Sequence, residues 1–416
     1  MKRLLKVTAM TGLLTLLRMM MGFVIAKVVA IYTGPTGMAM LGQLQSMTAS
    51  LNGIVNAPAG SGIVRFTAEH HDHGFDACSP WWRASVRWIM VLLAILIPLG
   101  CLLAKPLSNW LFSNTDYAWL IIVSTLGLPF SAAGTLVNSV TNGQQQYKRY
   151  VGLGMLSVLI SSTIMLTFII KGNLTGALLA AAMQAGLIGC VMLVASLRQP
   201  WFKLQYWWGT SGQVERRAIG GYILMAITSA LTVPVSLVLV RNILVAEVGW
   251  EQAGQWQAVW KISEVYLGVI TMALGTYYLP KLASIKGVEA IRYEINMVAK
   301  IIMPIVVCMA VIVYISRDFA IQILFTSEFN SARDLFAIQL LGDVVKIASW
   351  LYAYPMLARG TTRWFVTTEI IFSFSWILFS WVCISKYGTQ GANMAYLINY
   401  VLYFLFLYFN LNRFAR

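Results

Sequence analysis

Two pairs of glutamines lie in apolar stretches of this chain, about half its length apart. The segments Leu41–Ser46 (LGQLQS) and Ala253–Ala258 (AGQWQA) each carry Gly-Gln-x-Gln, and the second begins 212 residues after the first. Amide groups inside a lipid bilayer are costly unless they find hydrogen-bond partners. The pairs therefore indicate either hydrogen bonds between helices or a polar cavity.

Each pair belongs to a longer polar stripe whose members share one face of a helix. The stripes are Gln45, Thr48, Asn52 and Asn56 in the first copy, and Gln257, Lys261, Glu264 and Gly268 in the second. Lipid would penalise such stripes, whereas a water-filled cavity would not. The charges of the second stripe favour a cavity, and bonding between helices is the alternative.

Five basic side chains fall inside apolar stretches, where ionisable groups are expensive and mark function by default. They are Arg18, Lys27, Arg241, Lys261 and Lys346. Arg18 lies in the middle of its stretch with no carboxylate within a turn or two, so we expect it to face water or an anion. Lys27 and Arg241 lie near the outer ends of theirs, where snorkelling to the interface is the alternative.

Carboxylates in the second half have basic neighbours. Lys261 with Glu264, and Asp343 with Lys346, are spaced i, i+3, so each pair can neutralise itself on one helix face. The alternative is that a carboxylate exchanges its partner for a proton or a sodium ion during transport. Glu369 has no close partner along the sequence.

The candidate cavity residues are mostly cationic, which points to an anionic substrate. Arg65, which follows the first stripe at the expected cytoplasmic mouth, adds a further cation for an anionic headgroup. Phosphate or pyrophosphate suits arginine because its planar fork binds two oxygens at once.

The composition is that of a membrane protein. Of 416 residues, 59% are hydrophobic and 11% charged, and the mean hydropathy is +0.72. Soluble domains have about a quarter of their residues charged. Runs of about 20 apolar residues predict an all-α integral membrane fold, and strand-length alternation is not the pattern. The twelve expected spans are residues 7–31, 38–60, 84–104, 117–141, 149–170, 173–196, 218–245, 254–279, 295–315, 332–357, 363–385 and 389–411.

The distribution of charge predicts the topology. With the N-terminus inside, cytoplasmic segments hold 20 of the 30 lysines and arginines, including Lys286 and Arg416, and the opposite side holds 5. The positive-inside rule then places both termini in the cytoplasm. The net charge of +15 is thus mostly a topology signal, and we expect no nucleic-acid partner.

Further landmarks recur at a similar offset. Leu111–Tyr117 (LFSNTDY) is echoed by Leu324–Asn330 (LFTSEFN), and Gly143 by Gly360. Their common order predicts duplication of a six-span unit, with domains 1–200 and 201–416; chance similarity among apolar segments is the alternative. Both copies then have one orientation, and transporters built from such parallel repeats bind substrate between the halves.

No motif for a cofactor or for catalysis is present. The sequence has no Walker, GxSxG, HExxH or CxxC pattern, so we expect a transporter rather than an enzyme, without metal or cofactor. The scattered cysteines are expected to act as small hydrophobes. In Ala68–Asp76 (AEHHDHGFD), His70, His71 and His73 with Asp72 could bind zinc, but a solvated cytoplasmic turn is the expectation.

Three segments carry a family resemblance: GPTGMAMLGQLQSMTASLNGI, VGWEQAGQWQAVWKISEVYLGVITMALGTYYLPKLASI and SRDFAIQILFTSEFNSARDLFAIQLLGDVVKIASW. They resemble the Wzx flippases of O-antigen and enterobacterial common antigen, in the multidrug/oligosaccharidyl-lipid/polysaccharide superfamily. The resemblance implies two six-helix bundles around a central cavity in the bacterial inner membrane. It also implies flipping of an undecaprenyl-pyrophosphate-linked oligosaccharide, as in lipopolysaccharide biosynthesis, by alternating access.

The resemblance also implies roles for the polar residues. Arg18 matches the position of a cavity cation in related flippases, and Lys27 lies near another. The expected substrate-binding set is Arg18, Lys27, Gln45, Asn52, Asn56, Arg65, Arg241, Gln257 and Lys261. The expected ion-coupling set, driven by a proton or sodium gradient, is Glu264, Asp343, Lys346 and Glu369. A glycan polymerase and a chain-length regulator are plausible family partners.

Two other functions make different demands on the sequence. A drug antiporter of the same superfamily predicts a cavity dominated by carboxylates. A membrane-embedded glycan polymerase predicts catalytic residues in a large outer loop. The sequence shows neither feature.

Overall fold

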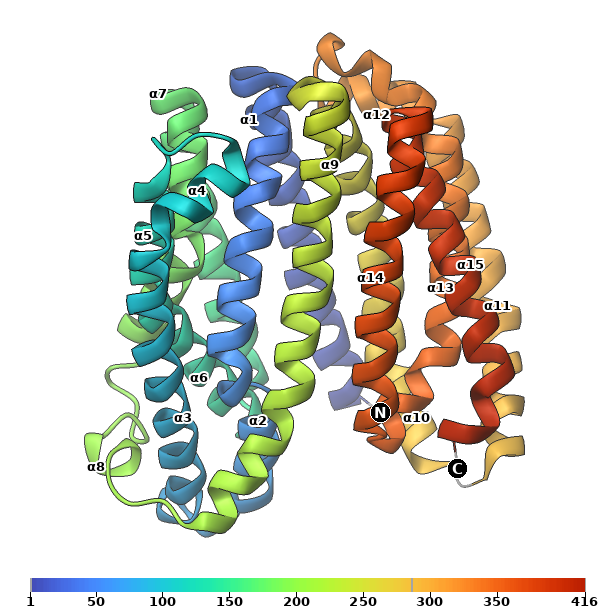
Figure 1. Cartoon of the computed structure of the whole chain (residues 1–416). Helices are drawn as coiled ribbons and strands as arrows, with labels where there is room; N and C mark the ends of the chain where they lie inside the picture. Colours follow the sequence, from blue (N-terminus) through green and yellow to red (C-terminus); the bar gives the residue numbers. More distant parts are fainter. Residues whose placement is uncertain (1, 286, 416) are drawn as a thin grey trace. The chain divides into compact units, whose positions relative to one another are not determined.

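The protein is helical wherever it is described. The computed structural model describes residues 2–285 and 287–415, and only the backbone for residues 2–9, 222 and 276. Lys286 and Arg416, counted above among the cytoplasmic cations, lie outside this range. No strand occurs in the described part (Figure 1), so the prediction of an all-α fold is confirmed.

The helices fall into long and short elements. The long ones are α1 (Lys2–Asn56), α3 (Phe75–Leu102), α6 (Leu128–Gly143), α7 (Tyr147–Val194), α9 (Gln213–Ala273), α11 (Val288–Ile315), α13 (Phe336–Arg359), α14 (Thr362–Tyr387) and α15 (Thr389–Phe414). The short ones are η1 (Ala57–Ala59), α2 (Ser61–His70), η2 (His71–His73), α4 (Ala104–Phe112), α5 (Ala118–Leu126), α8 (Leu204–Trp207), η3 (Leu274–Tyr278), α10 (Leu279–Ser284), α12 (Arg317–Leu324) and η4 (Ser327–Leu335).

Three of the longest helices are pairs of spans joined by a sharp turn. In the described residues, nine helices are long and apolar enough to cross a membrane. Of these, α1 is broken at Gly34, α7 at Asn173 and α9 at Gly249. Counting the parts separately gives twelve spans in this part of the chain, which agrees with the sequence prediction.

The unusual backbone positions recur along the chain. Gly34 (φ 62°) and Gly249 (φ 86°), 215 residues apart, both turn the chain through positive φ, where glycine has no Cβ to clash. Further positive-φ positions 213–215 residues apart are Gly74 with Gly287, Gln145 with Gly360, and Asn173 with Gly388. Each pair follows the same span in the two halves, so the turns add independent support for duplication.

The chain divides into two compact units. Unit 1 comprises Met1–Tyr32 and Gln43–Val235, and unit 2 comprises Thr33–Gly42 and Ser236–Arg416. A ten-residue piece of the first half therefore packs within unit 2. The division into domains 1–200 and 201–416 stays a prediction.

The core of unit 1 is aromatic and includes the segment that follows α7. Trp82 and Trp201 are fully buried, and the ring of Trp207 stacks on Trp82 at 4.9 Å between centroids. The Trp82 indole donates to the Thr67 hydroxyl at 2.9 Å, and the Ser79 hydroxyl donates to a backbone carbonyl of α8 at 2.8 Å. The connecting segment is thereby held on α2 and α3.

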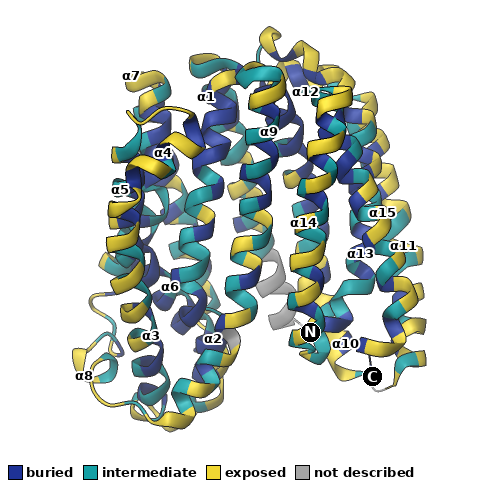
Figure 2. Cartoon of the chain, in the orientation of Figure 1, coloured by how far each residue is buried: buried dark blue, intermediate teal, exposed yellow. Residues whose placement is uncertain are grey.

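Unit 2 contains helices that approach closely at glycine. A Cβ on Gly342 of α13 would meet the ring of Tyr396 of α15, and one on Gly254 of α9 would meet the carbonyl of Pro35. Exposed residues recur along α14 (Figure 2), and the exposed apolar residues of α11 and α14 include Ile301, Ile312 and Phe374. Exposed apolar faces of this kind suit contact with lipid.

We predict that Gly254→Ala destabilises the fold by about 2 kcal/mol, because the added methyl group overlaps a backbone carbonyl that cannot rotate away. Gly268→Ala in the same helix has open space and is the control; it should change stability by no more than about 1 kcal/mol. Denaturant unfolding in detergent micelles measures both. Equal stability of the two variants would contradict the close packing.

Candidate functional site

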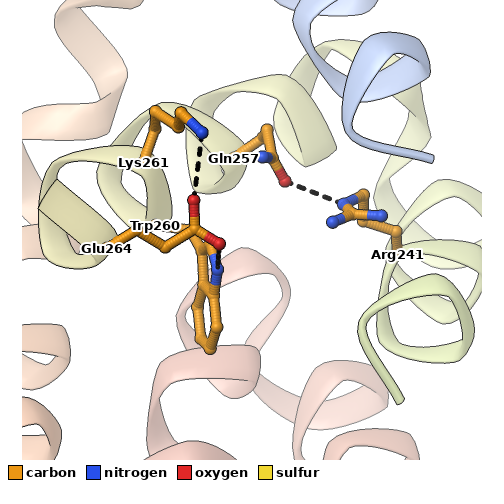
Figure 3. Close-up of polar contacts among 5 residues, drawn as sticks. All are labelled: Arg241, Gln257, Trp260, Lys261 and Glu264. Atoms are coloured by element: carbon orange, nitrogen blue, oxygen red, sulfur yellow. Dashed lines mark hydrogen bonds and ion pairs between the residues drawn. The ribbon is translucent and has the colours of Figure 1, made fainter. Parts of the chain in front are cut away.

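A buried arginine in unit 2 is held by the second glutamine of the second Gly-Gln-x-Gln pair. Arg241 is 1% exposed and Gln257 is 4% exposed. They come from the two parts of α9, and the Nε of Arg241 donates to the Gln257 side-chain oxygen at 2.8 Å (Figure 3). The guanidinium also lies 6.0 Å from the Trp256 ring. The side chain thus points into the protein instead of along its surface.

The glycine of the first pair completes this arrangement. A Cβ on Gly42 would come within 2.7 Å of the Gln257 side chain. Gly42 and Gln257 both belong to unit 2. Gly42 therefore leaves room for the side chain of Gln257, which in turn binds Arg241.

One turn further along α9, an ion pair faces partly outward. Lys261 Nζ lies 3.1 Å from Glu264 Oε2, and the Trp260 indole donates to Glu264 Oε1 at 3.1 Å (Figure 3). The pair that the i, i+3 spacing allows is therefore formed. Its side chains are 33% and 45% exposed.

The second spacing-based pair is not formed, and this corrects the sequence analysis. Asp343 is fully buried, and no described lysine or arginine lies within ion-pair distance of it. Its oxygens accept four hydrogen bonds instead, from Ser263 Oγ and Tyr266 OH at 2.6 Å, from Tyr396 OH at 2.9 Å and from Gln339 Nε2 at 3.2 Å. A buried carboxylate with four donors is stabilised without a counter-ion in contact.

The ammonium group of Lys346 occupies a cage of aromatic rings. Its Nζ lies 5.1 Å from the centroid of Trp350, 5.5 Å from Trp260, and 5.6 Å from both Tyr396 and Tyr400. Ring faces attract a cation through their quadrupole, most strongly where water is excluded. The rings replace the carboxylate contact that the spacing had suggested.

Three residues of the predicted ion-coupling set lie at this cage, because Glu264 and Lys346 line one cavity and Asp343 accepts a hydrogen bond from the cage residue Tyr396. The fourth, Glu369, lies half-buried on α14. All four belong to unit 2. Their role in coupling stays a prediction.

The amides of the first stripe lie in unit 1 and bond mainly within it. Asn52 Nδ2 donates to the carbonyl of Thr48 at 2.7 Å, and Asn56 Nδ2 donates to Ser131 Oγ at 3.2 Å. The side-chain oxygens of both asparagines are buried without a partner among the described residues. Gln45 is half-buried. Two acceptors in unit 1 are thus available to a hydroxyl or amide donor.

The cations predicted in unit 1 have different surroundings. Arg18 is exposed on α1 and makes no ion pair or hydrogen bond with the described residues. Lys27 is half-buried and has an interaction partner. Arg65 pairs with Glu69 at 2.8 Å, one turn later on α2, a partner that the sequence analysis missed.

The histidine cluster forms a turn at the surface. His70 and its neighbours end α2 and form η2, where His71 Nδ1 lies 2.9 Å from an Asp72 oxygen. No group of three metal-ligating side chains occurs in the described part of the chain. The described cysteines are all free thiols.

The sequence analysis did not identify the aromatic residues of the cage. A signal was present, because Lys346 and Trp350 are four residues apart, as are Trp256 and Trp260. Residues four apart share a helix face. The spacing within each helix did not reveal that these faces meet.

Comparison with known proteins finds relatives of similar length. Over 411 residues the chain is 29% identical to the lipid III flippases of Escherichia coli (strain K12) and Shigella flexneri, which covers 96% of this chain and 96% of each relative. No protein-family profile matches the chain.

The fold resembles that of solved transporters. A multidrug resistance MATE family transporter of the MOP superfamily, in an inward-facing conformation, matches with a TM-score of 0.72 and 13% identity. The match covers 96% of this chain and 98% of the transporter. At this identity it establishes the fold, and with the apolar helices it identifies a multi-pass membrane protein.

We predict that Gln257→Leu lowers the free energy of unfolding by about 2 kcal/mol, because it removes a buried hydrogen bond to the charged Arg241. Lys261→Ala breaks a partly exposed pair and should change stability by less than about 1 kcal/mol. Unfolding in detergent, monitored for both variants, makes the comparison. If Lys261→Ala loses more stability than Gln257→Leu, the hydrogen bond between Arg241 and the Gln257 amide does not stabilise the fold as we expect.

Proposed function

We propose that this chain is a Wzx-type flippase, which moves an undecaprenyl-pyrophosphate-linked oligosaccharide from the cytoplasmic to the periplasmic leaflet by alternating access. One observation carries the proposal: the 29% identity to lipid III flippases extends over 96% of both chains. Because the similarity extends over 96% of both chains, it favours a shared transport function and not merely one segment in common. The glycan is of the O-antigen or enterobacterial common antigen kind.

The polar residues fit an anionic substrate that carries sugars. Arg18, Lys27 and Arg65 in unit 1, with Arg241 and Lys261 in unit 2, would offset the charge of pyrophosphate while it crosses. Gln45, Asn52, Asn56 and Gln257 would bond sugar hydroxyls, and the free side-chain oxygens of Asn52 and Asn56 support this role. The polyprenyl tail would stay in lipid.

Coupling to an ion gradient would fall to the residues around Lys346. Glu264, Asp343 or Glu369 would take up a proton or a sodium ion, and Lys346 would respond to the change in charge. The position of Glu264 beside Lys346 in one cavity, and the hydrogen bond from the cage residue Tyr396 to Asp343, support this assignment. A ligand shifts a conformational equilibrium only by its differential affinity for the two states.

The cellular setting follows from the proposed substrate. The protein would reside in the bacterial inner membrane with both termini in the cytoplasm, as the 20-to-5 distribution of basic residues indicates. A glycan polymerase and a chain-length regulator would act next on the flipped lipid and are the expected partners.

A drug antiporter is the second candidate, because MATE transporters share the fold. The charged residues argue against it. Small organic cations need an accessible carboxylate. Asp343 is fully buried among hydrogen-bond donors, and the partly exposed Glu264 already has Lys261 as its partner, so an organic cation would have to displace these contacts.

We expect Arg18→Ala to reduce flipping at least about tenfold, since one lost charged contact to pyrophosphate is worth about 1.5–3 kcal/mol. Reconstituted liposomes holding an undecaprenyl-pyrophosphate oligosaccharide report flipping through access of an external lectin. Arg363→Ala, at another exposed arginine, is the control and should flip normally. If Arg18→Ala flips the substrate as fast as the wild type does, Arg18 is not part of the site. If the wild type exchanges organic cations and does not flip the glycan, the protein is an antiporter.

We expect Asp343→Asn to flip substrate without stimulation by a proton gradient, because the isosteric amide keeps its hydrogen-bonding neighbours but cannot ionise. Glu247→Gln at an exposed position is the control and should keep the stimulation. The same liposomes, with and without an imposed gradient, give the measurement. If a proton gradient stimulates Asp343→Asn as fully as the wild type, Asp343 is not the coupling residue, and Glu264 or Glu369 is the candidate instead.

A further inference from the structure

Unit 2 contains a cavity beside the aromatic cage. It has a volume of about 140 Å³ and lies among α9, α13 and α15, of which α13 and α15 run side by side (Figure 1). One wall is aromatic, formed by Trp260, Trp350 and Tyr396. The remaining lining is largely polar and consists of Ser263, Glu264, Leu267, Gly268, Thr271, Gln339 and Lys346.

A buried acceptor in this lining has no partner. Gln339 is fully buried, and its Nε2 donates to Asp343, which fixes the orientation of the amide. Its Oε1 makes no hydrogen bond with any described residue. A buried oxygen of this kind costs free energy unless a ligand or a water molecule donates to it. The cavity therefore presents an acceptor held in place by the Asp343 network.

A donor faces the same space. The ammonium group of Lys346 carries three N–H donors, yet its contacts within the described chain are with ring faces, not with hydrogen-bond acceptors. The cavity thus offers one fixed acceptor and one set of donors. A ligand that satisfies both must itself donate and accept.

The aromatic wall includes one ring, that of Trp350, that does not pack against another ring among the described residues. Trp260 stacks on Trp376 at 5.6 Å and meets Tyr396 edge-on at 5.3 Å. Trp350 packs against no other ring among the described residues, and Lys346 is the charged group placed over it. Its indole leaves apolar area for the flat face of a ligand.

We propose that this cavity binds one sugar ring of the transported glycan, an inference that rests on the proposed flippase function. Sugar hydroxyls both donate and accept, so one can donate to Gln339 Oε1 and another can accept from Lys346. The C–H face of the ring would lie on Trp350. Pockets for whole ligands span about 300–1,000 Å³, so a cavity of about 140 Å³ takes one ring of a longer glycan.

Other occupants fit the lining less well. A metal or organic cation in the cavity would be repelled by the ammonium group of Lys346. It would also have to displace the donors that Asp343 and Glu264 already hold. Water molecules fill polar cavities, so a sugar that enters this one would displace water.

Binding by the purified full chain tests the proposal with two probes, an undecaprenyl-pyrophosphate-linked disaccharide and sugar-free undecaprenyl pyrophosphate. The wild type should bind the disaccharide form more tightly. Gln339→Leu removes the acceptor, and Gly268→Leu fills the cavity from a position where a Cβ meets nothing within 4 Å. Each should weaken disaccharide binding about tenfold and leave sugar-free binding unchanged.

Three further variants separate stacking from misfolding. Trp350→Phe keeps an aromatic face and should retain the preference for the disaccharide, whereas Trp350→Leu should lose it. Gly221→Leu, in the same helix α9 but in unit 1, also has open space and should bind both probes as the wild type does.

The outcomes distinguish this proposal from the proposed function. If Gln339→Leu and Gly268→Leu bind the disaccharide form as the wild type does, or lose both probes equally, the sugar site is wrong while the flippase stands. If the wild type binds neither probe, both fail. If the wild type binds sodium ions, Gln339→Leu and Gly268→Leu abolish that binding, and neither variant changes the affinity for the disaccharide, the cavity is a cation site and the proposal is overturned.

Discussion

Unit 2 must hold ionisable side chains inside an apolar bundle of helices, and this requirement shapes its interior. An ion moved out of water loses hydration that the protein has to replace. Asp343 receives four hydrogen bonds from three helices, and Lys346 receives four aromatic faces. The side chains of Asp343 and Lys346 do not form an ion pair with each other, so each is stabilised by its own set of neighbours.

These neighbours in turn fix how the helices pack. Tyr396 serves both ions, because its hydroxyl donates to Asp343 while its ring faces Lys346. Gly342 lets α13 approach this ring closely, and Trp376 of α14 backs Trp260. A cavity edged by such groups keeps its shape when empty, and that is the pre-organisation a small ligand site requires.

The two halves of the predicted repeat share the positions of their turns but differ in chemistry. Positive-φ residues recur at nearly constant offset, so the backbone plan is common to both. The charges are not: the stretch Ala118–Gly143 has no ionisable residue, whereas its counterpart in the second half holds Asp343 and Lys346. In the first copy the polar stripe consists of amides that bond within unit 1. Coupling chemistry concentrated in one copy is consistent with this asymmetry.

The sequence by itself determined the helical membrane fold and the number of spans, because apolar runs are local properties of the chain, while the repeat stays a prediction. It also located the polar stripes, since residues three and four apart share a face whatever the helix packs against. Only the tertiary structure decided the partners. It separated Asp343 from Lys346, buried Arg241 against Gln257, and brought Trp260, Trp350, Tyr396 and Tyr400 around one ammonium group. These contacts join helices that are far apart in the sequence. Packing decides which groups surround a buried ionisable side chain, and therefore whether a counter-ion, dipoles or aromatic rings stabilise it.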